Sequence, residues 1–196
     1  YQEDSENSHY IGDTKLIQEK DSTFNSVTIS LSGAFHRNNM STVLNGEGAH
    51  AGFYGFFYGE DNNLTDNHIF VDHAVPKCTS DELYKNILND TSHGIFNGKI
   101  YVRKDAQQTD AFQTNRNILL TDSATVNTKP QLEIYADDVK CSHGATSGTL
   151  DKTSLFYLRS RGLSEDQAKA LLLNSFAQDI VNKIKIEPLR NYIAKQ

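Results

Sequence analysis

The tripeptide Cys141-Ser142-His143 is the part of the chain whose residue types could do the clearest chemistry. On an extended strand, positions two apart share a face, so the thiol and the imidazole would project together. A thiolate and a neutral imidazole are both good ligands for iron, and a nearby histidine favours the thiolate. Two ligands cannot close a metal site, and cysteine is often simply buried. The residues alone therefore leave a metal-binding role and a packing role open.

Signatures of enzymatic chemistry are scarce elsewhere in the sequence. It contains no phosphate-binding glycine loop, dinucleotide fingerprint, nucleophile elbow or metalloprotease histidine pair. Asp137 and Asp138 are adjacent, so on a strand they would point to opposite faces and make a poor catalytic pair. The other histidines are scattered, as structural side chains usually are. The sequence favours a protein that is not an enzyme, with a carbohydrate-active lyase or hydrolase as the alternative.

Composition narrows the class of protein further. The chain has 196 residues and a formal net charge of −6, without a basic patch that would neutralise several phosphates, so we expect no nucleic-acid partner. Cys78 and Cys141 are too few for a disulfide framework, which indicates a reducing compartment. The polar start lacks the pattern of a signal peptide, and the most apolar window, 51–59, is too short to span a bilayer. These features predict a cytoplasmic protein with no membrane partner.

Short strands should dominate the chain from about Val27 to Leu150. The candidate segments are rich in Val, Ile, Phe and Tyr and are bounded by Gly, Asn, Asp and Ser. They are Val27–Leu31, Ser41–Leu44, Phe53–Tyr58, His68–Val71, Lys99–Val102, Asn117–Leu120 and Leu132–Tyr135.

The spacing of the turns bears on how these strands are arranged. Gly33, Gly46 and Gly59 lie thirteen positions apart, which favours a coil-by-coil architecture. Asn-Gly pairs at 45–46 and 97–98 would also suit hairpins, so a sandwich stays open. Asn115 and Asn117 belong to a stretch of amides that would either stack between coils or form a polar surface loop.

Helices should follow from about Lys152. Ser164 and Gln167 form a capping-box pattern, and an apolar face follows at helical spacing. Its members are Ala168, Leu171, Leu172, Phe176, Ile180 and Ile184. Ser154–Arg161 predicts a further short helix stopped by Gly162, and Pro188 is suited to open a terminal helix. We expect the apolar face to pack on the strand domain, with any excess available to a partner.

Several longer segments resemble a known family. Lys129–Thr146, with the sequence KPQLEIYADDVKCSHGAT, is similar to the signature segment of the SufD branch of the SufB/SufD family. Leu155–Gly162 resembles the next motif of that branch, and Phe96–Val102 and Gln108–Asn115 resemble its strand region. SufB members typically have Glu where this chain has Gly144, and a Cys where it has Leu158. Both differences point to the SufD branch, and they leave this chain without the cysteine credited with cluster assembly on SufB.

The resemblance implies a mainly β fold, a right-handed parallel β-helix followed by a small C-terminal α-helical domain. It places the β-helix in 1–151, without its N-terminal part, and the helical domain in 152–196. The resemblance further implies that the protein is a non-catalytic scaffold subunit of the SufBCD complex for iron–sulfur cluster assembly. The helices of that subunit dock the ATPase SufC and receive its motion, and the implied docking residues are Leu171, Leu172, Phe176 and Ile180.

The resemblance also implies a role for the end of the β-helix. In the family this end meets SufB, and a transient iron–sulfur cluster forms near the interface without a stably bound cofactor. His143 is then the more probable ligand and Cys141 the second. A homodimer of the isolated chain is a further alternative, because an open β-helix end invites pairing. Members of the family are about twice this length, so the chain corresponds to their C-terminal part.

Overall fold

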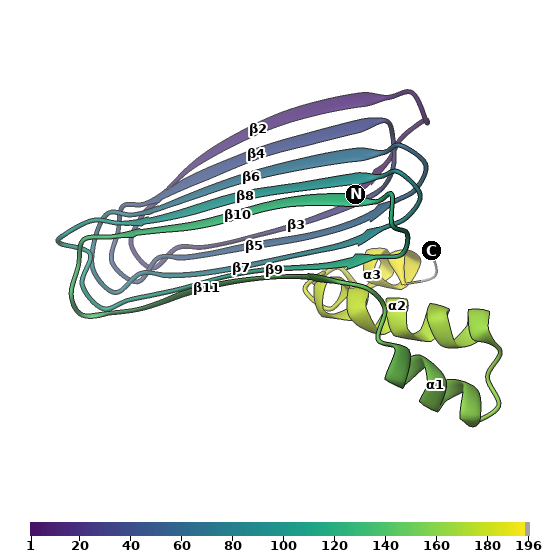
Figure 1. Cartoon of the computed structure of the whole chain (residues 1–196). Helices are drawn as coiled ribbons and strands as arrows, with labels where there is room; N and C mark the ends of the chain where they lie inside the picture. The colour runs from purple at the N-terminus through teal and green to yellow at the C-terminus, as the bar shows by residue number, and fades with distance from the viewer. Residues whose placement is uncertain (195–196) are drawn as a thin grey trace.

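The computed structural model describes residues 1–194, with strands in the first three quarters of the chain and helices at its end (Figure 1). The strands are β1 (Gln2–Glu3), β2 (His9–Gln18), β3 (Thr23–Ser32), β4 (Phe35–Leu44), β5 (His50–Gly59), β6 (Leu64–His73), β7 (Thr79–Leu88), β8 (His93–Val102), β9 (Thr109–Leu119), β10 (Thr125–Ile134) and β11 (Val139–Gly148). The helices are α1 (Lys152–Ser160), α2 (Glu165–Val181) and α3 (Glu187–Ile193).

The strands form two sheets that the chain visits alternately. Sheet A has the order β1-β3-β5-β7-β9-β11, and sheet B has the order β10-β8-β6-β4-β2. The pairs within both sheets are parallel, and each step along a sheet is one coil: Phe35 pairs with Leu64, and Leu64 pairs with His93. The fold is therefore a parallel β-solenoid, as predicted, and the alternative of a hairpin-based sandwich is wrong.

The Asn-Gly pairs, which suggested hairpins, have other roles. Asn45 and Gly46 lie in the turn from β4 to β5, but these two strands belong to different sheets. Asn97 and Gly98 lie inside β8. Gly33 and Gly46 lie in successive turns, and Gly59 is the last residue of β5. The spacing of thirteen residues is therefore close to the length of one strand and its turn, which make up about half a coil.

Turns between the strands use residues with positive φ. Asp61 has φ of 50° and Asp90 has φ of 49°, a region that aspartate tolerates better than most residues. These two turns stack, since the backbone N–H of Asp61 donates to the Asp90 carboxylate at 3.1 Å. The stacked turns hold successive coils in register.

Most of the predicted strand segments lie within longer strands, and four strands, the two-residue β1 and the full-length β2, β7 and β11, lie outside them. β2, β7 and β11 are rich in polar residues, including Asp81, Glu82, Lys85 and Asn86 on β7. These segments are strands because the neighbouring coils supply their hydrogen-bond partners, which local propensity does not report. Leu120 and Tyr135 fall just beyond the ends of β9 and β10.

The core fills the space between the two sheets. Tyr84 and Phe96 pack with ring centroids 5.0 Å apart, and Gly55 leaves room for the Tyr84 ring, which a Cβ at that position would meet at 2.2 Å. Buried amides share this interior: the side chain of Asn86 donates to that of Asn117 at 2.7 Å. The stacked-amide interpretation of this stretch is confirmed.

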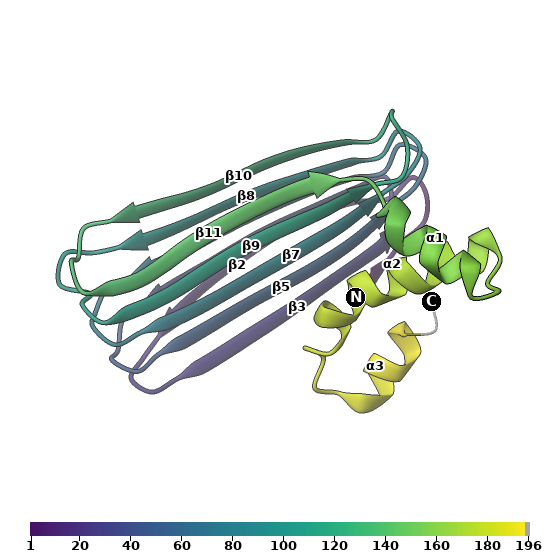
Figure 2. The same cartoon turned by 60° about the horizontal axis from the view of Figure 1, so that its bottom comes forward.

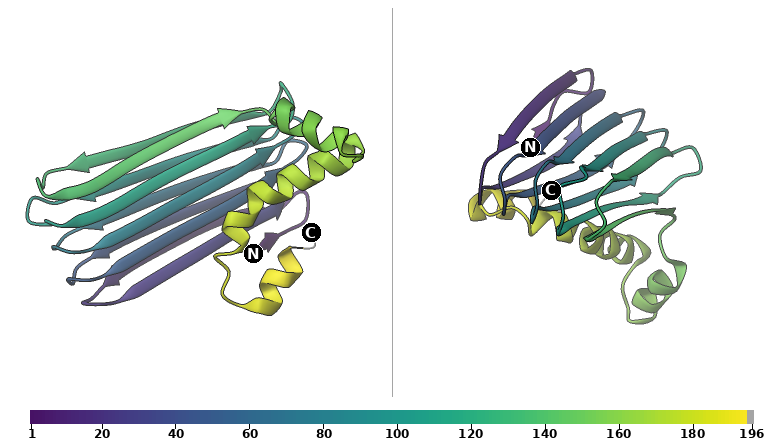
Figure 3. Two further views of the ribbon diagram at one scale, coloured as in Figure 1. Left: turned by 90° about the horizontal axis from the view of Figure 1, so that it is seen from below. Right: turned by 90° about the vertical axis from the view of Figure 1, so that its left-hand side faces the viewer.

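Helices α2 and α3 lie across one end of the outer face of sheet A, and the outer face of sheet B is bare (Figures 1 and 3). Ser164 and Gln167 form the predicted capping box, and Pro188 lies in the first turn of α3. Ile180, Val181 and Ile184 pack against Ile29 and Tyr54 on the strands, so the C-terminal half of α2 is anchored.

A buried lysine fastens the same half of α2. The Nζ of Lys85, on β7, donates to the Phe176 carbonyl at 2.8 Å and to the Asp179 carboxylate at 2.5 Å. The side chain of Lys85 is only 2% exposed, so its charge depends on these contacts. The hydrogen bond from Lys85, together with its charge, lowers the pKa of Asp179 against the opposing effect of burial.

The proposed boundary at 151/152 falls between the end of β11 and the start of α1, and residues 195–196 of the predicted helical domain lie outside the described residues. Among residues 1–194, the helices are too short or too polar to cross a membrane.

Candidate functional site

The last coil of the solenoid consists of β10 and β11, each the outermost strand of its sheet (Figure 2). The register places Cys141 beside Ala111 and His143 beside Gln113. Ala111 and Gln113 are buried on β9 and face the interior. Cys141 and His143 therefore share the inward face of the last coil, where no further strand covers them among residues 1–194.

Cys141 is the deeper of the two predicted ligands. It is half-buried and packs against the core between the sheets. Burial raises the pKa of its thiol, although the Ala111 amide hydrogen bond opposes the shift. The histidine two positions away was expected to favour the thiolate, but the pKa of the thiol is raised. Cys141 is held mainly as a thiol, the weaker metal-binding form.

His143 is exposed at the open end of the solenoid. Its side chain makes no hydrogen bond with the residues that the structure describes, so both ring nitrogens are accessible to a ligand. Imidazole nitrogen is a good ligand for iron and zinc. His143 is therefore better suited than the protonated thiol of Cys141 to bind such a metal ion. No group of three or more His, Cys, Asp or Glu side chains gathers into a metal site within residues 1–194.

Pro130 marks β10 as an edge strand. It lies beside Gly98 of β8, and proline, which has no N–H to donate, is tolerated in sheets mainly at edges. Leu132, two residues further, turns inward and packs against the core. Val139, Cys141 and Leu132 of these two strands thus pack against the core, whereas His143 lies exposed.

A buried polar pair lies beneath His143, and sequence reasoning missed it. Gln113 Nε2 donates to Glu82 Oε2 at 2.8 Å, and both side chains are almost completely buried. Burial raises the pKa of Glu82 to about 8, against the opposing effect of the Gln113 hydrogen bond. No local signal in the β7 segment distinguishes Glu82 from a surface residue, because its burial depends on the coils on either side.

Other histidines have structural partners. His50 Nδ1 lies 2.8 Å from Thr79 Oγ1, and His73 Nε2 lies 2.9 Å from Ser80 Oγ. Burial lowers the pKa of His73 to about 4, so this imidazole is neutral.

A second candidate surface lies on the helices. A shallow apolar groove separates α1 from the N-terminal half of α2, and α1 buries none of its own residues. Phe156 is 75% exposed beside it. The groove is lined by Thr153, Ser154, Tyr157, Leu158, Leu171, Leu172 and Ser175.

The four predicted docking residues divide between two environments. Leu171 is 47% exposed and Leu172 is half-buried, and both line the groove. Ile180 is completely buried against sheet A, and the Phe176 ring lies under the Lys85 ammonium, 4.6 Å from its centroid. The latter two face the solenoid and have little surface to offer a partner.

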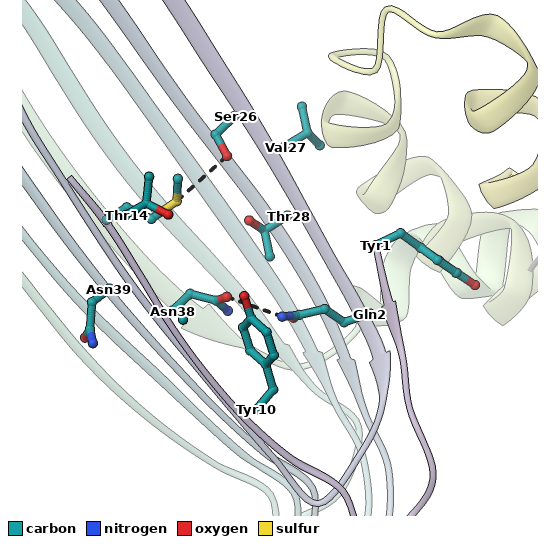
Figure 4. A pocket seen from close by; sticks show the side chains of 11 residues that line it. Tyr1, Gln2, Tyr10, Thr14, Ser26, Val27, Thr28, Asn38 and Asn39 are labelled. Carbon is teal, nitrogen blue, oxygen red and sulfur yellow. Dashed lines mark hydrogen bonds between the residues drawn. The ribbon is translucent and has the colours of Figure 1, made fainter. Parts of the chain in front are cut away.

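A pocket of about 310 Å³ lies at the other end of the solenoid and is lined mainly by residues of β1, β2, β3 and β4 (Figure 4). Figure 4 shows amide and hydroxyl groups around it, with Gln2 hydrogen-bonded to Asn38. Its lining includes no His, Cys, Asp, Glu, Lys or Arg. The only ionisable side chains in its lining are the phenols of Tyr1 and Tyr10, so it has no carboxylate, imidazole or thiol to hold a metal ion.

Fold and site together define a class of protein: a parallel β-solenoid with an exposed histidine on its last coil and helices appended to one sheet. The family model described as "SUF system FeS cluster assembly, SufBD core domain" matches residues 1–176. The chain belongs to this SufBD family of iron–sulfur cluster assembly proteins, which bears out the resemblance seen in the sequence.

Curated relatives agree with this assignment. The chain is 39% identical over 186 residues to the iron–sulfur cluster assembly protein SufD of Escherichia coli K12, covering 95% of the chain and 44% of the relative. It is 35% identical over 189 residues to the SufBD family protein slr0076 of Synechocystis, covering 96% and 42%. Protein ABCI7, chloroplastic, of Arabidopsis thaliana is 35% identical over 193 residues, covering 97% and 40%. The chain thus spans less than half the length of these relatives.

Proposed function

We propose that this chain is the interface-forming part of a scaffold subunit that helps to build iron–sulfur clusters and performs no hydrolysis itself. The observation that carries the proposal is the position of His143, exposed on the inward face of the outermost strand. The cluster is the cargo of such a subunit and not a resident cofactor.

The open coil suits an interface with the sister subunit SufB. A single imidazole with a half-buried thiol behind it leaves most of a cluster's coordination to be completed by ligands from another chain. The edges of β10 and β11 present unpaired backbone groups that can extend into a neighbouring sheet. His143 serves as the ligand, and Cys141 has at most a secondary role because its thiol is held protonated.

The ATPase SufC docks at the groove between α1 and α2. Exposed Phe156, Tyr157 and Leu171 give this surface the aromatic and aliphatic anchors typical of interface centres. Because α2 is anchored to sheet A only through its C-terminal half, the groove lies away from the solenoid and leaves the last coil free.

The decisive experiment compares cluster formation on the reconstituted complex of the full-length protein with SufB and SufC. His143→Ala should reduce the rate of cluster formation at least about tenfold, because a lost ligand weakens the site. His9→Ala, an exposed histidine on the opposite end strand of sheet B, is the matched control and should have no effect. Unchanged cluster formation in His143→Ala would refute the ligand role.

Complex formation itself is tested first by size-exclusion chromatography with light scattering. The full-length protein mixed with SufB and SufC should elute as one mixed complex, and alone as a monomer or homodimer. A folded protein that joins neither partner would remove the scaffold proposal altogether.

A further inference from the structure

Polar side chains of this solenoid bond to their register partners on the next coil. His50 and Thr79 are register partners and are joined by a hydrogen bond, and so are His93 and Thr125. Asn86 bonds in the same way to Asn117. The side chain directly above or below in the stack is thus a recurrent partner of polar groups in this fold.

Glu82, Gln113 and His143 form one such column. Glu82 is the register partner of Gln113, and Gln113 is that of His143. The amide nitrogen of Gln113 is used by Glu82, whereas its buried Oε1 has no hydrogen-bond partner. An orphaned buried acceptor is costly and rare.

The amide of Gln113 is held in place from the opposite sheet. A Cβ at Gly98 would lie 2.4 Å from Gln113 Nε2, so glycine at this position makes room for the amide. Since the oxygen and nitrogen of an amide lie on opposite sides of its carbon, Oε1 is directed away from the Glu82 carboxylate that Nε2 contacts. His143 is the register partner of Gln113 on the opposite side from Glu82, and its exposed side chain is free to rotate toward the amide.

We propose that Gln113 is a positioning residue: its Oε1 accepts a hydrogen bond from one ring N–H of His143 once the sister subunit covers the last coil. The bond fixes the tautomer and directs the other ring nitrogen to the iron of the forming cluster, as outer partners of metal-bound histidines generally do. Glu82 in turn fixes the orientation of the amide. This inference rests on the proposed ligand role of His143.

The test measures the tautomer of His143 by ¹⁵N NMR, in full-length protein bound to SufB, at about pH 8.5, where ordinary histidine is neutral. Wild-type protein should show one tautomer. Gln113→Met, which keeps the length of the side chain but removes the acceptor, should show a mixture of both and should slow cluster formation at least about tenfold. A mixture in the wild-type protein overturns the proposal without any variant.

A swapped variant separates positioning from packing. Glu82→Gln combined with Gln113→Glu keeps a hydrogen-bonded pair and returns an acceptor beneath His143, so a single tautomer should be restored. Failure of this rescue in a folded double variant would contradict the proposal. If His143→Ala leaves cluster formation unchanged while the tautomer of His143 in the parent protein still depends on Gln113, then Gln113 positions His143 but His143 is not a cluster ligand.

Discussion

Glu82 is a carboxyl group enclosed by the solenoid interior, with Gln113 as its single hydrogen-bond partner among residues 1–194. Its Oε1 is buried without a partner. Removing an ionised carboxylate from water costs far more than one neutral donor returns, so the protonated form is favoured in the fold. At this scale, the buried acid makes the stability of the solenoid depend on pH above the acidic range.

The direction of this dependence follows from the raised pKa. The pKa of Glu82 is about 8 in the folded chain and near its ordinary value of 4.5 in the unfolded chain. The stability that depends on protonated Glu82 is therefore fully present below about pH 4.5 and is lost as pH rises through about 8. Glu82→Gln should be more stable than wild type at pH 8, on the order of a few kcal/mol, with the difference shrinking toward pH 5.

Urea unfolding of both proteins between pH 5 and 9 measures this difference. Glu60→Gln, an exposed carboxyl on a turn, is the matched control and should track the wild type at every pH. A constant difference between Glu82→Gln and wild type across the range would show that Glu82 stays ionised.

At the scale of elements, α2 combines an anchored half with a free half. Ile180 is completely buried against Ile29 and Tyr54, whereas Leu171 on the same helix lines the exposed groove. The two ends of the helix thus serve stability and recognition separately.

This division predicts that one alanine substitution on α2 lowers stability and another lowers binding. Ile180→Ala should lower the free energy of unfolding by about 2–5 kcal/mol, because it leaves a cavity at the sheet. Leu171→Ala should change it by less than about 1 kcal/mol and weaken binding to SufC instead. Denaturant unfolding and titration calorimetry give the two numbers, and a loss of SufC affinity confined to Ile180→Ala would place the docking surface elsewhere.

Elements with local signals were predictable from the sequence, and those that depend on stacking were not. The capping box of Ser164 and Gln167 is specified within four residues, so the start of α2 was found. β7 carries Glu82, Lys85 and Asn86, whose partners lie far away in the sequence on β9 and α2. Strand alternation predicted that Cys141 and His143 share a face, but the inward direction of that face and the support from Gln113 depend on register between coils, which no local pattern encodes.

At the scale of the whole molecule, the two candidate surfaces lie on different elements. Helix α2 contacts sheet A at β5 and β7, whereas the last coil is formed by β10 and β11. We therefore expect the two proposed partners to bind at the same time without competing.

Blocking the last coil should abolish one interaction and leave the other intact. Ala145 is exposed on β11, so Ala145→Arg adds bulk and charge at the open end without disturbing the core. We expect binding to SufB to weaken more than about tenfold, with unchanged melting temperature and SufC affinity. Ala170→Arg, an equally exposed position on α2, is the control for SufB binding, and equal SufB affinity of both variants would exclude the last coil as the interface.

The connection between β11 and α1 has a mechanical consequence. Only Thr149, Leu150 and Asp151 separate the end of β11 from α1, and α1 is fastened to the solenoid by no buried residue of its own. Force applied to α1 is thus transmitted through a short tether to Gly148. When a strand is pulled from its end, its hydrogen bonds to the neighbouring strand break in sequence from that end. The bonds between β11 and β9 near Gly148 would therefore break before those at His143. The strand that carries the candidate ligand is the first that such a pull would peel away.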